Sequence, residues 1–160
     1  VINAAYGLKV TDTQKFLSSL VLVDSKTGKI VKESPVTVIR NRTVYPVENY
    51  YIAVAGLSGG NSAVKLVQID NQNMEIIKET NEILAENSVL TEKDGIYYVV
   101  IQEGRNNYVA CYNKDLALQA KSDITVLPET AITVTEFGIM VADSYSTPKL
   151  LQIGNLKEIK

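Results

Sequence analysis

The sequence lacks histidine and tryptophan altogether and has a single cysteine among its 160 residues. Histidine is the commonest general base and the commonest metal ligand, so its absence removes the simplest routes to acid–base catalysis and metal binding. One cysteine excludes a disulfide framework within the chain and a cysteine-ligated zinc site. We interpret Cys111 as a small core residue, because its neighbours form a strand-like run and no histidine is present to activate the thiol.

Strong charge and long apolar runs are also missing. The formal net charge is −2, so no basic field points to a nucleic-acid partner. No run is long and apolar enough to span a bilayer, so we expect no membrane insertion by this domain. Val1 is not a natural start, which is compatible with an export segment or a domain upstream.

What the sequence does contain is typical of strands. Apolar residues make up 46% of the chain, with nine tyrosines and many valines, isoleucines and threonines. No helical periodicity extends beyond a few residues. The length suffices for one domain with a sizeable core, so we expect a single all-β domain over residues 1–160.

A repeated pattern organises these strands. An apolar strand, a turn with Asp, Asn or Gly, and a second strand that closes on a lysine occur four times. The lysines recur at intervals of 46, 43 and 39 residues, and they are Lys32, Lys78, Lys121 and Lys160. A strand, a turn and an apolar strand repeat in phase with this pattern. Four strands in about 42–46 residues is the size of one propeller blade.

The pattern therefore predicts four blade-like repeats, with units at about 4–49, 50–94, 95–136 and 137–160. The fold class is a small β-propeller or a propeller-like arc. We favour a closed or nearly closed disc with residues 1–3 near residues 157–160, and an open arc is the alternative. Val23 and Ile69 lie on apolar strands expected in the core, whereas Lys78 is expected to reach water.

Two resemblances carry this further. The run Val23-Asp-Ser-Lys-Thr-Gly-Lys-Ile-Val31 resembles the blades of quinoprotein-type β-propellers. The tryptophan that marks those blades is absent, so neither pyrroloquinoline quinone nor any other cofactor is expected. Residues 112–131 and 86–91 resemble the C-terminal domain of the spirochaete eighty-three/one-hundred-kilodalton antigen family. That resemblance implies an extracytoplasmic, cell-envelope-associated protein with an upstream helical region, and it supplies no catalytic motif.

Three acidic residues are the candidate binding residues. Glu48, Asp94 and Glu136 occupy equivalent turns, so we predict that they lie at one end of the domain as an acidic binding rim. Solvated turns without a ligand are the plainer interpretation. Carboxylate pairs also serve glycoside hydrolysis, which keeps a hydrolase among the alternatives.

The other polar and aromatic features have structural interpretations. Short polar side chains recur between the paired strands of each unit, where they bond the backbone rather than calcium; they are Asp24, Asp70 and Asn113. The tyrosine pairs at 50–51 and 97–98 fit packing between blades better than stacking on a sugar or peptide. The glycine-rich run at 56–61 lacks the ending of a phosphate loop and is interpreted as a hairpin loop.

The sequence thus favours a non-enzymatic interaction or ligand-binding module on a propeller-like scaffold. Its partner would be a protein or a carbohydrate, bound at loops that rigid blades hold in place. No catalytic, cofactor-binding or metal-binding residue is assigned. The alternatives are a carboxylate-dependent hydrolase acting on carbohydrate or peptide, and a purely structural repeat domain of a larger protein.

Overall fold

The computed structural model describes residues 4–57 and 63–160, and in this part of the chain all regular structure is β. Fourteen strands form four successive groups. The first group comprises β1 (Ala4–Asp12), β2 (Leu17–Asp24) and β3 (Ile30–Glu33), and the second β4 (Ile39–Val47), β5 (Tyr50–Ala55), β6 (Lys65–Asp70) and β7 (Ile76–Glu79). The third comprises β8 (Thr91–Lys93), β9 (Ile96–Glu103), β10 (Asn106–Tyr112) and β11 (Leu118–Lys121), and the fourth β12 (Thr133–Thr135), β13 (Gly138–Ala142) and β14 (Pro148–Leu151).

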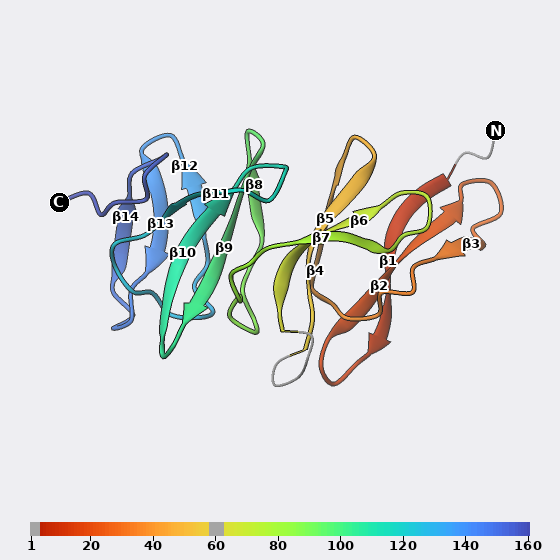
Figure 1. The fold of residues 1–160 in the computed structure, drawn as a ribbon, viewed down its shortest axis with the longest axis horizontal. Helices are drawn as coiled ribbons and strands as arrows, with labels where there is room; N and C mark the ends of the chain where they lie inside the picture. The colour runs from red at the N-terminus through yellow and green to blue at the C-terminus, as the bar shows by residue number, and fades with distance from the viewer. Residues whose placement is uncertain (1–3, 58–62) are drawn as a thin grey trace.

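Every strand pair is antiparallel, and the four groups stand side by side along the long axis as blade-like sheets (Figure 1). The first and second groups are linked by strand pairing between β2 and β4, at the residue pair Ser18 and Ile39. The third group is the four-stranded meander β11-β10-β9-β8, and the fourth is β12-β13-β14 with a bridge from Leu151 to Glu158. This arrangement confirms the all-β, propeller-like arc predicted from the sequence.

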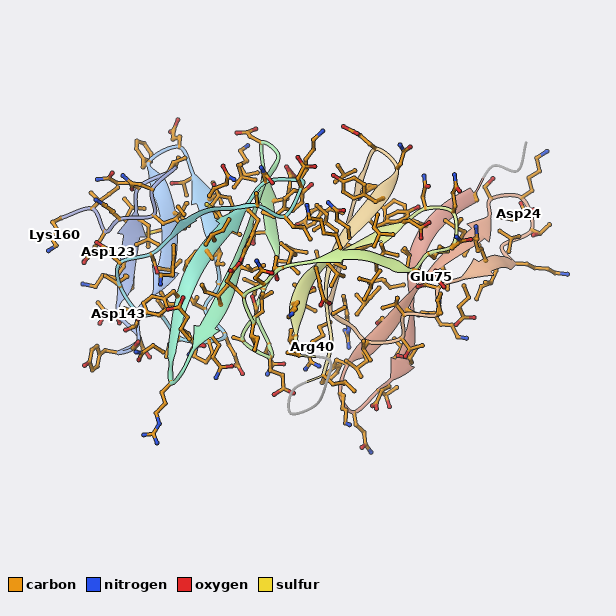
Figure 2. All side chains as sticks on the ribbon, in the orientation of Figure 1. Asp24, Arg40, Glu75, Asp123, Asp143 and Lys160 are labelled. Atoms are coloured by element: carbon orange, nitrogen blue, oxygen red, sulfur yellow. The ribbon has the colours of Figure 1, made fainter. Side chains whose placement is uncertain are left out.

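The arc is open. Strand β1 lies at one end of the long axis and the C-terminus at the other, and Asp24 and Lys160 are likewise far apart (Figures 1 and 2). The closed disc that we favoured from the sequence is therefore wrong, and the open alternative holds. Residues 1–3, for which that expectation placed the closing contact, lie outside the described part, as do residues 58–62 of the predicted loop at 56–61.

The sheets are offset by one strand from the sequence units. The strand that ends each unit pairs with the strand that opens the next, giving the hairpins β4–β5, β8–β9 and β12–β13. Only two residues separate the strands of each hairpin, and so short a connection forces antiparallel neighbours. The longer connection after β7 and after β11 instead crosses to the following sheet. A sheet therefore begins at β4, β8 and β12, one strand earlier than the units read from the sequence.

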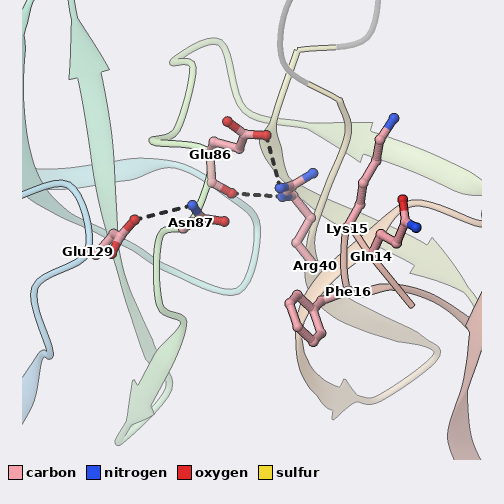
Figure 3. Close-up of a pocket in the computed structure, with 7 residues that line it drawn as sticks. All are labelled: Gln14, Lys15, Phe16, Arg40, Glu86, Asn87 and Glu129. Atoms are coloured by element: carbon pink, nitrogen blue, oxygen red, sulfur yellow. Dashed lines mark hydrogen bonds and ion pairs between the residues drawn. The ribbon is translucent and has the colours of Figure 1, made fainter. Parts of the chain in front are cut away.

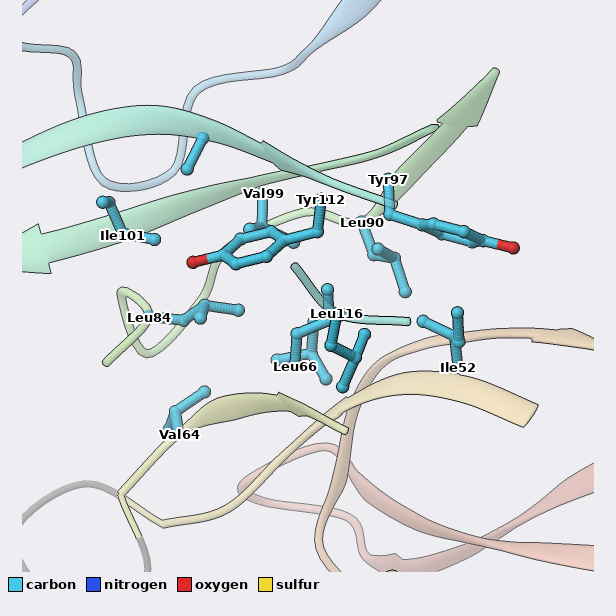
Figure 4. Close-up of a cluster of buried hydrophobic side chains, with 12 residues drawn as sticks. Ile52, Val64, Leu66, Leu84, Leu90, Tyr97, Val99, Ile101, Tyr112 and Leu116 are labelled. Carbon is cyan, nitrogen blue, oxygen red and sulfur yellow. The ribbon is translucent and has the colours of Figure 1, made fainter. Parts of the chain in front are cut away.

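The core lies between successive sheets, in three separate clusters. Alternation along β9 shows how one strand serves two of them. Tyr97, Val99 and Ile101 pack toward the second sheet (Figure 4), whereas Tyr98 and Val100 pack toward the fourth. Successive side chains of a strand point to opposite faces, so a sheet between two others must be apolar on both.

Position along the arc decides how deeply a strand is buried. Ile69 on β6 is fully buried, as predicted, because sheets flank it on both sides. Val23 on β2 is only half-buried, which corrects the prediction that it lies in the core, since it belongs to the first sheet of the arc. Lys78 on the edge strand β7 is exposed, as predicted.

Polar side chains build the turn before the last strand of each sheet. The carboxylate of Asp24 accepts the Lys26 amide at 2.8 Å, and that of Asp70 accepts the Glu75 amide at 2.9 Å. The side-chain oxygen of Asn113 accepts the Ala117 amide at 3.0 Å. The prediction that these side chains bond the backbone is confirmed.

Two of these turns, and the turn that follows β14, carry an apolar residue in the left-handed backbone conformation. Met74, Leu116 and Leu156 have φ values of 57°, 60° and 59°, and each is buried in the cluster shared with the preceding sheet. That conformation costs an L-residue roughly 1–2 kcal/mol, and burial of a large apolar side chain offsets it. In the first sheet Gly28 has the left-handed φ, at 71°, so this turn presents no side chain to a preceding sheet.

Candidate functional site

The three predicted rim residues occupy hairpin turns along one long edge of the arc (Figure 1). Glu48 and Asp94 have positive φ values of 48° and 53°, which the tight two-residue connection requires. The side chains of Glu48, Asp94 and Glu136 are all exposed. They belong to three different sheets, so the spacing between sheets decides which of them share a site.

Glu48 is already bound by the chain itself. The Lys114 ammonium lies 2.7 Å from Glu48 Oε1 and crosses from the third sheet to the second. The backbone carbonyl of Lys114 accepts the Tyr50 hydroxyl at 2.9 Å and the Gln68 amide at 2.7 Å. The hydrogen bond to Glu48 raises the pKa of Lys114 above its ordinary value. This lysine bridges the second and third sheets at the edge that carries the hairpin turns.

Asp94 and Glu136 line one groove between the third and fourth sheets. Its volume is about 390 Å³, and Ile96, Val134 and Ile153 supply much of its apolar wall. Neither carboxylate forms an ion pair within residues 4–57 and 63–160. Ile153 in the fourth sheet occupies the turn position that Lys114 occupies in the third sheet. The groove between the third and fourth sheets therefore has no lysine at the position corresponding to Lys114.

Tyr98 also lines this groove. Its side chain is only 3% exposed and packs in the cluster between the third and fourth sheets, as the packing interpretation of the tyrosines predicts. Its hydroxyl has no hydrogen-bond partner among the described residues, whereas the buried Tyr112 hydroxyl donates to Glu82 at 2.7 Å. Burial raises the pKa of Tyr98, with smaller contributions from Cys111 and the Asp94 carboxylate. The groove thus combines two carboxylates, the Lys93 side chain, a neutral hydroxyl and apolar walls.

A second hollow, of about 540 Å³, surrounds Arg40 (Figure 3), which lies toward the edge opposite the hairpin turns (Figure 2). Its charged side chains bind one another and the backbone. The Arg40 guanidinium donates to the Glu86 carbonyl at 2.7 Å and to the Glu86 carboxylate at 3.3 Å, and Asn87 donates to the Glu129 carboxylate at 3.3 Å. These contacts hold β4 to the segment that leads into β8, and that segment to the one that leads into β12. The sequence offered no signal for this arrangement, because Arg40 and Glu86 pair only through packing.

Several kinds of site are not found in the part of the chain that the structure describes. No group of three or more histidine, cysteine, aspartate or glutamate side chains is placed to hold a metal ion there. Nor does that part contain a helix able to cross a bilayer. Of the three predicted rim residues, Asp94 and Glu136 line a common hollow.

Two solved structures resemble this arc. The computationally designed Ika8 protein superimposes with a TM-score of 0.59 at 14% identity, over 97% of this chain and 48% of that one. BamB from Moraxella catarrhalis gives a TM-score of 0.49 at 10% identity, over 100% of this chain and 61% of that one. The chain therefore spans about half to three fifths of the length of these structures, and the likeness to Ika8 concerns the fold alone. No curated protein matches the sequence.

One protein family matches this sequence over most of its length. Residues 1–132 match the family described as Borrelia P83/100 protein, which covers most of the 160 residues. The match includes all of residues 86–91 and 112–131, the segments on which the resemblance to the spirochaete antigen family rests. The chain belongs to the Borrelia P83/100 protein family.

Proposed function

We propose that this domain is a non-enzymatic interaction module whose partner, a protein, meets the edge that carries the hairpin turns. The observation that carries the proposal is the groove of Asp94, Tyr98 and Glu136, which offers unpaired carboxylates and a tyrosine hydroxyl beside apolar walls. Binding sites typically combine apolar walls with a few convergent polar groups. Rigid sheets hold these groups in place, since the turns between β8 and β9 and between β12 and β13 contain two residues each.

An exposed aromatic side chain on the same edge supports this choice. Phe137 follows Glu136 in the β12–β13 turn and is 76% exposed. Aromatic residues that lose their exposure on association contribute strongly to protein–protein interfaces. The turn therefore places an apolar anchor next to the acidic groove.

Family membership supports an extracytoplasmic, cell-envelope location for the module, as the antigen resemblance implies. In that setting the partner is a component of the envelope or of its surroundings. A structural role within a longer protein is compatible with the arc, but it does not account for the unpaired carboxylates of Asp94 and Glu136 in the groove.

Photo-crosslinking tests the proposal. A photoreactive phenylalanine analogue replaces Phe137 on the hairpin edge or, as the matched control, Tyr145, which is 88% exposed in the turn between β13 and β14. After illumination with a spirochaete envelope fraction, we expect a discrete product from position 137 that excess unmodified domain suppresses. The same products from both positions, or none from 137, would overturn the proposal.

A carboxylate-dependent hydrolase is the second candidate, because Asp94 and Glu136 share one groove. A panel of glycosides and peptides tests it directly. Turnover that Asp94→Asn and Glu136→Gln each abolish would favour the hydrolase over the interaction module.

A further inference from the structure

The groove between the third and fourth sheets has the features of a site for one basic side chain. Building on the interaction module proposed above, we infer that it binds a lysine or arginine of the partner protein. The cation lies at the Asp94 and Glu136 carboxylates, and the aliphatic stem packs on Ile96 and Ile153. Long basic side chains pair an apolar stem with a charged end, which matches apolar walls with acidic rims.

The neighbouring gap of the same molecule gives the internal precedent. There Lys114 extends from its turn to Glu48 with a contact of 2.7 Å, and Tyr50 binds its backbone carbonyl. Asp94 occupies the hairpin position of Glu48 one sheet further on, and Ile153 occupies the turn position of Lys114. The fold thus repeats the acidic half of a lysine contact and omits the lysine.

The unpaired Tyr98 hydroxyl is a second and independent indication of a ligand. The Tyr98 side chain is 97% buried, but its hydroxyl oxygen opens onto the groove and keeps contact with solvent, and it forms no hydrogen bond with the described residues. Since Tyr98 lines the groove, an occupant can supply that hydrogen bond. A backbone carbonyl beside the bound basic residue is a suitable acceptor.

Charge and size limit the occupant to a single basic residue with apolar neighbours. Lys93 lines the groove too, and its positive charge balances one of the two carboxylates. The remaining negative charge can be balanced by one further cation. The volume of about 390 Å³ falls within the range of about 300–1,000 Å³ that accommodates small ligands. A strongly basic tract is too large for this space.

A peptide titration tests this inference. The probe is N-acetyl-Leu-Lys-Leu-amide, added to isotope-labelled domain and followed by amide NMR shifts, and the matched probe carries glutamine instead of lysine. We expect saturable shifts at Asp94, Gly95, Glu136 and Phe137 with the lysine peptide and at least about tenfold weaker binding of the glutamine peptide, a factor that corresponds to about 1.4 kcal/mol.

Two variants remove the charge and keep the fold. Asp94→Asn preserves a residue that tolerates the φ of 53°, and Glu136→Gln changes an exposed side chain. Each is expected to weaken the lysine peptide severalfold, and both together to abolish the shifts. Glu48→Gln is the matched control on the equivalent hairpin, and it should leave the affinity unchanged because Lys114 binds Glu48.

The outcomes separate this inference from the broader proposal. Equal binding of the two peptides, shifts mapped outside the groove, or no shift at about 10 mM peptide, weaker than any useful contact, would overturn it. The crosslink from position 137 would persist in that case if the module binds a partner of different chemistry. Loss of that crosslink, with peptide binding intact, would instead count against the proposed interaction module.

Discussion

The left-handed backbone conformation of Leu116 leads to an unusual prediction. At this position, substitution by glycine should destabilise the domain less than substitution by alanine. Leu116 is 7% exposed and packs in the cluster between the second and third sheets, with φ at 60° (Figure 4). Truncation to alanine is expected to destabilise the domain by about 2–5 kcal/mol, through lost burial and the cavity that remains. Glycine removes one carbon more, and it also changes the backbone preference.

The two backbone effects have opposite signs at this position. Alanine still carries the strain of the left-handed conformation, roughly 1–2 kcal/mol, whereas glycine does not. Glycine loses about 0.5–1 kcal/mol more than alanine through the conformational freedom of the unfolded chain. The Leu116→Gly variant is therefore expected to be more stable than Leu116→Ala by up to about 1.5 kcal/mol.

Leu66 supplies the matched control. It is fully buried in the same cluster but lies in the extended strand β6, where its φ is not positive. There Leu66→Gly is expected to be less stable than Leu66→Ala by about 0.5–1 kcal/mol. Urea unfolding of the four variants measures both differences. If glycine is the less stable substitution at both sites, the turn does not impose the left-handed conformation and the reasoning fails.

Four further predictions concern charge, reactivity, burial and metals. The backbone amides of Glu75 and Asn73 lower the pKa of Asp70 below its ordinary value of 3.8, so its ionised form stabilises the fold above that pH and the contribution is lost on further acidification. Asp70→Asn should flatten the loss of stability below about pH 4 in acid titrations followed by circular dichroism. Burial raises the pKa of the Cys111 thiol, so labelling by a thiol reagent should proceed at the rate of unfolding, and fast labelling of the native domain would contradict its place in the core. Ile69→Ala should cost about 2–4 kcal/mol and Lys78→Ala less than about 0.5 kcal/mol in denaturant unfolding; similar values would contradict the assigned exposure of β7. A chelator should leave the Tm unchanged, because no cluster of metal-ligating side chains occurs in the described part, and a fall of several degrees would show a structural ion.

Local signals in the sequence account for the strands, the turns and the family. The period-two alternation and the aromatic and β-branched content specify strands without regard to their neighbours. Asp70 and Asn113 hydrogen-bond amides within five residues of themselves, so their turns follow from local chain geometry. Glu48, Asp94 and Glu136 lie in turns for the same reason, since two residues connect each pair of strands; their role as a binding rim stays a prediction.

Grouping into sheets was harder to read from the sequence. Repetition establishes a period but not the strand at which a sheet begins, because any cyclic shift of the same four strands repeats equally well. Hydrogen-bond pairing across the tight turns resolves that choice in favour of β4, β8 and β12. The same limitation explains the error at Val23, whose pattern matches that of Ile69 although only the latter has sheets on both sides.

The open arc and the groove were decided by tertiary structure alone. Both depend on which side chains from different sheets meet, and a contact over tens of residues leaves no periodic trace in the sequence. Lys114 reaches Glu48 across 66 positions, so Glu48 is bound while Asp94 and Glu136 remain unpaired within the described residues. By itself, the sequence determined the strands, the turns and the family, because local backbone preferences and side-chain alternation suffice for them. The packing of one sheet against the next determined the shape of the arc and the one groove that two of the predicted acids share.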